Sequence, residues 1–292
     1  ALWAGIKEKN PLILVFMTKY LVVFILLISQ ILSAQSGWTK KKGEAYTQLS
    51  FTTINNYNTI FGNPEYTTER EITDNTLQFY AEYGLSNKTT IILNLPIKFI
   101  ETGRLVDNET AITTTNSVYN LGNIEIGIKH QIYNKKWVVS GQLNIETNTG
   151  TYDNLSGIST GADAWTFTPT INFSRSFEKF YVQAFTGANL RTNNYSHNFK
   201  IGGEIGTKPM KHVLLIAFLD VIESFENGNI NLPIANQLTA LYVNNQEYTS
   251  YGLKIIGELS NTFGINAGLG GSFSGNNVAK SPAITLGLYH SF

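Results

Sequence analysis

Apolar residues recur at every second position through most of this chain. The pattern is clearest over 77–83, 91–99 and 124–132, where aliphatic or aromatic residues alternate with polar residues or glycine. A period of two is typical of a β-strand with one apolar and one polar face. The pattern predicts an all-β fold of about twelve strands, each near the ten residues that a tilted membrane-spanning strand needs. The other strand-like runs are 43–54, 139–146, 164–175, 179–191, 198–206, 212–221, 247–259, 262–273 and 283–292.

The connections between these runs are alternately long and short. A transmembrane up-and-down antiparallel β-barrel has this arrangement, with long external loops at one end and tight periplasmic turns at the other. An even number of strands would return both termini to the periplasmic side of an outer membrane. The long connections are 55–74, 101–120, 148–163 and 222–246, and the short ones are 84–88, 134–136, 176–179, 207–211 and 260–262.

Composition supports a membrane barrel and excludes several other classes. Only 14% of the residues are charged, against about 25% in soluble domains. The mean hydropathy of -0.07 is too low for a helical membrane protein with several apolar spans. The formal net charge of +0 offers no basic surface for nucleic acid. Cysteine is absent, which excludes disulfide scaffolds, thiolate metal sites and cysteine nucleophiles.

The N-terminal region has the organisation of a secretory signal peptide. Lys19 supplies a basic start, 20–32 is apolar, and Ala34 is a small residue suited to a cleavage site. The alternative is a retained helical anchor over 11–32, which Lys19 would interrupt. We expect residues 1–16 to be an upstream or non-native extension, 17–34 a signal peptide, and 35–292 the outer-membrane barrel.

The last ten residues form a strand that ends on an aromatic side chain. Such a strand resembles the closing strand of bacterial outer-membrane barrels, in which a final Phe is recognised by the insertion machinery. We therefore expect Phe292 to contact that machinery, and the strand to pair with 45–54 and close the barrel. Ile284, Leu286, Leu288, His290 and Phe292 would face outward, and Thr285, Gly287, Tyr289 and Ser291 inward.

Three short motifs resemble an outer-membrane β-barrel family described as transporters of the MetA pathway of phenol degradation. They are Tyr83-Gly-Leu-Ser-Asn-Lys, Leu93-Asn-Leu-Pro-Ile97 and the run 121–129, LGNIEIGIK, within a match over 46–292. The family usually has Gly-Asp where this chain has Gly122-Asn123. The resemblance implies an outer-membrane channel or transporter, but it does not transfer a phenol site to particular residues.

Ten ionisable residues fall on the polar phase of the strands, which we expect to line the lumen. Five are acidic and five basic, so the lumen has no dominant charge. They either pair across strands and stabilise the barrel, or form facing rows that orient a small polar or amphipathic solute. We predict a salt bridge between Lys129 and Glu146. The ten residues are Glu82, Lys98, Glu125, Lys129, Glu146, Arg191, Lys200, Glu204, Lys254 and Glu258.

Three further segments raise structural questions. Residues 264–272 place only small side chains inward, either to accommodate bulky neighbours such as Tyr289 or to leave room for a solute or a plug. Residues 36–42 could form that plug. Segment 222–246 contains apolar residues at 232–234 and 238–243, so it could fold over the mouth, bind a partner, or extend as a hairpin.

Pro96 and Pro169 fall inside strand-like runs, although proline cannot donate a ladder hydrogen bond. We expect both prolines at bulges or near the rim of the barrel.

Catalysis has little support in the sequence. Outer-membrane phospholipases are barrels that use Ser, His and Asn at the rim, but His130 and His290 lack a serine two residues further on. No carboxylate or histidine cluster has metal-ligand spacing, so we expect no catalytic residue, cofactor or metal. The sequence favours a passive channel for small solutes, aromatic or amphipathic molecules among them. A structural or partner-binding barrel of a surface or secretion assembly is the alternative, and a rim lipase the third. We expect contact with membrane lipid and none with nucleic acid.

Overall fold

A computed structural model describes residues 36–107 and 110–292. The predicted extension and signal peptide at 1–34 lie outside the described residues. The described chain is almost entirely antiparallel sheet, as predicted. Its elements are β1 (Ala45–Phe61), β2 (Tyr66–Ser86), β3 (Thr89–Leu105), β4 (Asn116–Leu121), β5 (Glu125–Asn134), β6 (Val138–Glu146), β7 (Thr166–Ser176), β8 (Phe180–Arg191), β9 (Asn198–Met210), β10 (Val213–Ser224), α2 (Ile234–Thr239), β11 (Glu247–Glu258), β12 (Phe263–Asn276), β13 (Val278–Ala279) and β14 (Ala283–Ser291).

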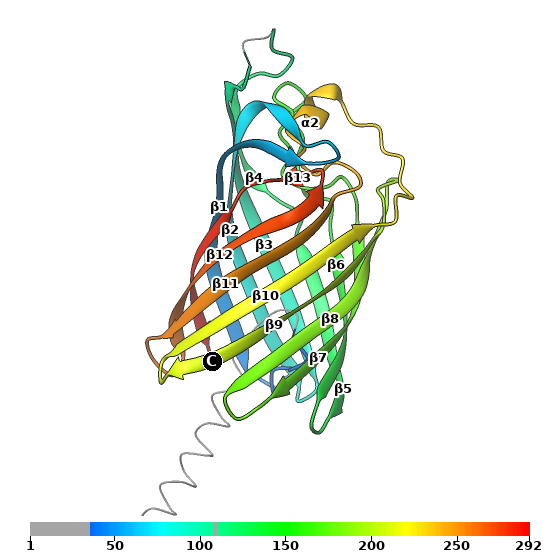
Figure 1. The fold of residues 1–292 in the computed structure, drawn as a ribbon. Coiled ribbons are helices and arrows are strands. Elements are labelled where there is room, and N and C mark those ends of the chain that lie inside the picture. The colour runs from blue at the N-terminus through cyan, green and yellow to red at the C-terminus, as the bar shows by residue number, and fades with distance from the viewer. Residues whose placement is uncertain (1–35, 108–109) are drawn as a thin grey trace, which may run out of the picture. The chain divides into compact units, whose positions relative to one another are not determined.

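The sheet closes on itself to form a barrel (Figure 1). Strand β1 pairs with β2 on one side and with β14 on the other, from Tyr46 opposite Ser291 to Thr53 opposite Ile284. The predicted closure by the last strand is therefore confirmed. Strands β4 and β5 pair with successive parts of β3, so they act as one interrupted strand. The two-residue β13 extends the pairing of β1 at the loop end, which leaves a barrel of twelve strands.

The outer surface of the barrel is apolar. On the last strand, the exposed fractions of Ile284, Leu286 and Leu288 are 50%, 60% and 47%, whereas inward Tyr289 is only 3% exposed. This confirms the predicted phase of β14. In water these exposed aliphatic side chains would be costly, but in a bilayer they face lipid. The described residues contain no helix that is long and apolar enough to cross a membrane.

Both prolines interrupt strand pairing, which accounts for their tolerance. At Pro96, the partner of β3 changes from β5 to β4, and the Pro96 carbonyl accepts a hydrogen bond from Gly122 N–H. The missing N–H of Pro96 thus lies beside the break between those two strands. At Pro169, the β7–β8 pairing stops after Phe167 and resumes at Thr170.

The first external loop is much shorter than the predicted 55–74. Strands β1 and β2 extend through most of that region and are joined by residues 62–65. In these strand extensions at the loop end, apolar side chains lie on the inner face of the barrel. Tyr57, Ile60 and Ile72 there form a buried cluster with Ile100, Ile158, Ala240 and Leu241. The sequence prediction failed because it assigned polar, Asn- and Thr-rich strand extensions to a loop.

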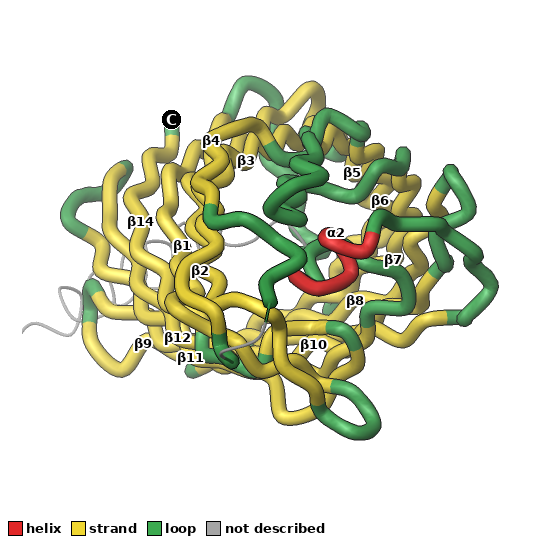
Figure 2. Tube along the Cα trace, turned by 90° about the horizontal axis from the view of Figure 1, so that it is seen from above, coloured by secondary structure: helices red, strands yellow, loops and turns green. Residues whose placement is uncertain are grey.

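Segment 222–246 folds inward over the mouth of the barrel. Viewed from above, α2 lies within the outline of the strands (Figure 2). Thr239 Oγ1 and Asn236 Nδ2 donate hydrogen bonds to the Gly157 carbonyl at 2.9 and 3.0 Å. Of the three predicted possibilities, the structure supports the loop that covers the mouth.

Candidate functional site

The ten predicted lumen residues divide into two groups. Six take part in ion pairs: Glu82, Lys98, Lys129, Glu204, Lys254 and Glu258. The ion pairs between described residues include none of the other four, Glu125, Glu146, Arg191 and Lys200. The paired group agrees with the first of the two predicted roles, in which charges pair across strands and stabilise the barrel. The four residues without an ion pair are described separately below.

Glu82 lies at the centre of a buried cluster near the short turns. Its carboxylate is 3.1 Å from Lys129 Nζ and 3.7 Å from Lys40 Nζ, and it accepts a hydrogen bond from the Tyr80 hydroxyl at 2.9 Å. Lys129 is fully buried. We call Lys40, Glu82 and Lys129 the lysine–glutamate cluster. Because a buried charge must be paired, this cluster couples three separate parts of the chain.

The predicted Lys129–Glu146 salt bridge is wrong. Lys129 pairs in register with Gln142, and Glu146 lies opposite Glu125 at the other end of the same strand pair. Lys129 instead reaches across β3 to Glu82 on β2. The prediction assumed that charges on adjacent strands meet, whereas register sets their height in the barrel.

Two further pairs brace the inner wall. Lys98 Nζ is 2.9 Å from the Asp74 carboxylate, and Lys254 Nζ is 3.7 Å from Glu204. The sequence analysis missed Asp74 because it placed that residue in a loop.

A third brace lies at the turn end. Glu258 pairs with Lys208, and the Nδ1 atom of His212 lies 3.8 Å from the Glu258 carboxylate.

Asp220 was also missed among the inward residues of β10. That strand has apolar residues on both faces, with inward Leu214 and Ile216 buried, so its phase could not be determined from the pattern. Gly202 lies opposite Asp220, and a Cβ at this glycine would overlap the Asp220 carboxylate and crowd the Phe185 ring.

Segment 36–42 packs against the inner wall near the short turns. Gly37 N–H donates to Ser174 Oγ at 2.7 Å, and Lys40 N–H donates to Thr90 Oγ1 at 2.8 Å. Ser174 and Thr90 are both fully buried, on β7 and β3 respectively. The Trp38 ring meets Tyr181 edge-on at 5.9 Å. The segment therefore lies inside the barrel, against β3 and β7, and not beside the small residues of 264–272 where the plug was expected.

The small residues of β12 mainly accommodate neighbouring side chains. A Cβ on Gly264 would come within 2.5 Å of the Tyr289 ring, and one on Gly270 within 3.3 Å of Phe218. This supports the packing alternative for these two positions. The residues that bind segment 36–42 lie on other strands, so the small residues of β12 do not form the surface on which this segment packs.

A cavity of about 270 Å³ lies inside the barrel at the loop end. We call it the polar cavity, because Glu125, Glu146, Arg191 and Lys200 all line it. Strands β5, β6, β8 and β9 supply these four side chains. The structure thus brings together the four predicted residues that lack an ion pair.

Loop residues form one side of the polar cavity. Tyr195 and Tyr242 line it, and Tyr195 packs with Ala162 and Ala164. The Tyr195 hydroxyl lies 2.8 Å from that of Tyr152. Burial, reinforced by this hydrogen bond, raises the pKa of Tyr195 well above its ordinary value, so the hydroxyl remains neutral.

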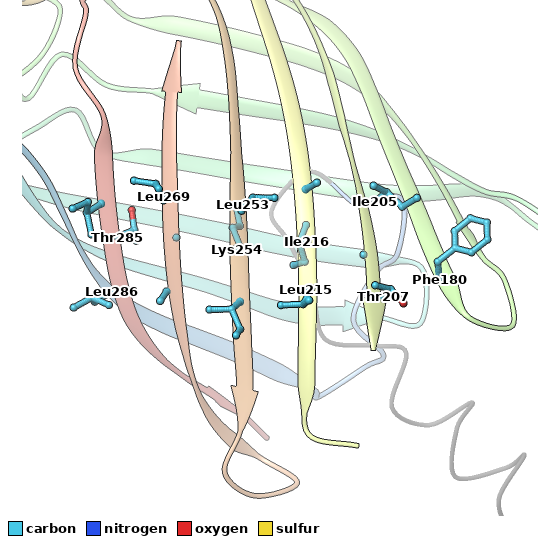
Figure 3. A pocket seen from close by; sticks show the side chains of 16 residues that line it. Phe180, Ile205, Thr207, Leu215, Ile216, Leu253, Lys254, Leu269, Thr285 and Leu286 are labelled. Atoms are coloured by element: carbon cyan, nitrogen blue, oxygen red, sulfur yellow. The ribbon is translucent and has the colours of Figure 1, made fainter. Parts of the chain in front are cut away.

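A larger hollow of about 670 Å³ lies on the outer surface, over β9 to β12 and β14 (Figure 3). Leu215, Leu253 and Leu269 contribute to its lining, and their exposed fractions are 42%, 65% and 56%. These residues belong to the apolar outer face of the barrel. The hollow is therefore part of the lipid-facing surface and not of the lumen.

The histidines make structural contacts. His130 Nδ1 lies 3.0 Å from Thr89 Oγ1 on the adjacent strand, and the His290 ring packs edge-on against Phe292 at 4.2 Å. His197 Nδ1 accepts a hydrogen bond from Arg191 N–H at 3.1 Å. Within 36–107 and 110–292, no group of three or more His, Asp or Glu side chains is placed to hold a metal ion.

The closed barrel with its apolar exterior defines the class of the protein, an outer-membrane β-barrel. The chain belongs to the family described as "Putative MetA-pathway of phenol degradation", whose model matches residues 25–292. This confirms the resemblance found in the sequence. A search of curated proteins returned no match to the chain.

Solved structures show the same fold at low sequence identity. An outer membrane channel from Pseudomonas putida F1 has a TM-score of 0.68 at 12% identity, with 90% of this chain and 100% of that chain covered. The translocator domain of the autotransporter NalP from Neisseria meningitidis has a TM-score of 0.53 at 10% identity, covering 95% of each. The β domain of the Bordetella autotransporter BrkA has a TM-score of 0.51 at 12% identity, covering 86% of this chain and 100% of that domain.

Proposed function

We propose that this protein is an outer-membrane channel for passive passage of small solutes that combine a polar group with an aromatic or apolar part. The observation that carries the proposal is the polar cavity inside a closed barrel, lined by charged side chains and tyrosine rings together. A barrel with a purely structural role would be expected to pair those charges, as the same lumen does elsewhere. The family description, which names phenol degradation, agrees with an aromatic solute.

Segment 36–42 would restrict flow through the channel. It is held by hydrogen bonds and by the lysine–glutamate cluster, and it lies against the inner wall at the turn end. Deletion of 36–42 should raise single-channel conductance of the purified protein in a planar bilayer. Lys42→Gln is the matched control, since Lys42 is exposed and its loss should leave conductance unchanged. Unchanged conductance after the deletion would reject the plug.

Solute passage requires its own measurement. Conductance of the wild-type protein should change when small aromatic acids are added, because a solute inside the lumen displaces ions. If the protein shows no conductance and instead retains a stable protein partner during purification, the alternative of a partner-binding barrel is favoured.

Both termini should lie on the periplasmic side, with the long loops outside. The even number of strands supports this orientation, as does the position of the C-terminus at the short-turn end (Figure 1). The chain has no cysteine, so single cysteines can report it cleanly. In intact cells, a membrane-impermeant maleimide should label Leu155→Cys in a long loop but not Lys135→Cys in a short turn. The opposite labelling would invert the orientation.

Phe292 is the residue that we propose contacts the insertion machinery. Its side chain is 64% exposed, while its backbone pairs with Ala45. Phe292→Ala should therefore slow insertion in cells and leave the stability of the inserted barrel nearly unchanged. An equal loss of stability in the purified variant would assign the residue a structural role instead.

A further inference from the structure

The charges of the polar cavity are arranged in a row. Strand register places Glu125 opposite Glu146, Glu146 opposite Thr166, and Thr166 opposite Arg191. Neighbouring strands lie about 4.8 Å apart, so the row starts with two adjacent carboxylates and ends about 10 Å further on with a guanidinium group. Lys200 lines the same cavity but lies opposite Gly187, four residues along β8 from Arg191, and so stands outside this row.

Each end of this row lacks a direct partner of opposite charge. Like charges directly opposite one another destabilise a strand pair, yet Glu125 and Glu146 adopt this arrangement. Glu146 accepts a hydrogen bond from Asn123 Nδ2 at 2.9 Å, but no ion pair between described residues reaches either carboxylate. Arg191 Nε is buried without a hydrogen-bond partner in the described structure. Buried unpartnered polar atoms of this kind call for a ligand, ion or water.

The remaining lining is suited to an apolar or aromatic group. Tyr195, Tyr242 and Tyr248 contribute rings, and Ile222 and Val243 contribute aliphatic surface. The volume of about 270 Å³ lies just below the range for drug-sized ligands, so the cavity fits a smaller molecule.

We infer that the polar cavity binds a zwitterionic solute of amino-acid size with an aromatic group. Its ammonium lies between Glu125 and Glu146, its carboxylate faces Arg191, and its ring packs on the tyrosines. A simple anion would satisfy Arg191 but leave the facing carboxylates in repulsion, and a simple cation would leave Arg191 unpartnered. Binding at this site does not depend on the proposed channel function. Only the claim that the bound solute passes through the barrel rests on that function.

The test uses three probes that differ in one charged group each. L-phenylalanine carries both charges, 3-phenylpropanoate lacks the ammonium, and 2-phenylethylamine lacks the carboxylate. Calorimetric titration of the full purified protein in detergent should show L-phenylalanine binding at least about tenfold more tightly than either analogue. Equal binding of all three probes, or no binding of L-phenylalanine, would overturn the inference.

Two variants assign the charges to their ends. Arg191→Gln should abolish the preference for L-phenylalanine over 2-phenylethylamine, and Glu146→Gln should weaken its preference over 3-phenylpropanoate. Arg104→Gln is the matched control, because Arg104 pairs with Glu71 on the exposed surface. Heat-modifiable migration on gels confirms that each variant is folded. A preference that survives Arg191→Gln contradicts the site.

Conductance of the same preparations separates the two proposals. If the protein conducts but does not bind L-phenylalanine, the binding site is rejected and the channel function stands. If the protein binds L-phenylalanine selectively but does not conduct, the binding site is supported and the channel function is rejected.

Discussion

At the turn end of the barrel, Glu82 lies between two lysine ammonium groups, whereas at the loop end Glu125 and Glu146 face one another without an ion pair. Both regions are inside the same barrel and contain both signs of charge. At the turn end, each charge has a protein partner, so the charges hold segments of the chain together. At the loop end, the acidic and basic groups line one cavity and share no ion pair among the described residues.

The largest difference between the two regions should appear in stability. Glu82→Gln leaves Lys40 and the fully buried Lys129 without their carboxylate, which should lower the free energy of unfolding by about 3–5 kcal/mol. Glu146→Gln should change it by less than about 1 kcal/mol, and in the stabilising direction, because it removes repulsion from Glu125. Urea unfolding followed by tryptophan fluorescence measures both.

A double variant is the control for that comparison. Glu82→Leu combined with Lys129→Met should recover a large part of the loss, because it removes the fully buried Lys129 together with its carboxylate and leaves only Lys40 without that partner. Equal destabilisation by Glu82→Gln and Glu146→Gln would show that the two regions do not differ in the way described.

The contrast also explains what the sequence could and could not predict. Period-two alternation and the terminal strand predicted the barrel, its strand number and its closure, because lipid outside and polar groups inside impose that pattern on most strands. Partner choice among the charges was not predictable. The Lys129–Glu146 salt bridge failed because it depended on register across a whole strand pair, and Asp74 was missed because strands extend beyond the lipid-facing band. The polar cavity requires loops folded inward, which no periodic pattern encodes.

Asn123 offers a way to enlarge the acidic side of the polar cavity. Its amide nitrogen donates to Glu146 and to the Ala162 carbonyl, and its oxygen accepts from Gly150 N–H. Asn123→Asp removes both donated hydrogen bonds and sets a third carboxylate beside Glu146. Stability should fall by about 1–3 kcal/mol in urea unfolding. The combination with Glu146→Gln should restore much of the loss, and no restoration would mean that repulsion is not the cause.

Gly84 tests whether the turn-end region controls flow. A Cβ on this inward glycine would overlap the backbone carbonyl of Lys41, so Gly84→Ala should push segment 36–42 from the wall. Single-channel conductance should rise severalfold. Gly271→Ala is the matched control, since its Cβ would meet nothing within 4 Å. Gly84→Ala should have no effect in a protein that already lacks 36–42. If it raises conductance there as much as in the full-length protein, the substitution does not act through segment 36–42.

The smallest expected effect concerns the loops around the polar cavity. Partial burial would raise the pKa of Asp153, but hydrogen bonds from Ser156 and Leu155 N–H outweigh it and lower the pKa below its ordinary value of 3.8. A carboxyl with a lowered folded-state pKa stabilises the fold above its unfolded pKa and loses that contribution as the pH falls through the folded value. The loop should therefore loosen only below pH 3.8, while the barrel remains intact.

Pepsin cleavage at the exposed Leu155 can report this loosening, because the enzyme is active across that pH range. Cleavage of the wild-type loop relative to Asp153→Asn should increase about twofold as the pH falls below the lowered pKa, in keeping with the modest strength of a largely exposed interaction. The ratio should remain constant above pH 5, where Asp153 is ionised in both folded and unfolded chains. A constant ratio at all pH values would show that Asp153 does not hold the loop, and its position would then depend on its other contacts, those of Tyr152 with Tyr195 and of Gly157 with α2 among them.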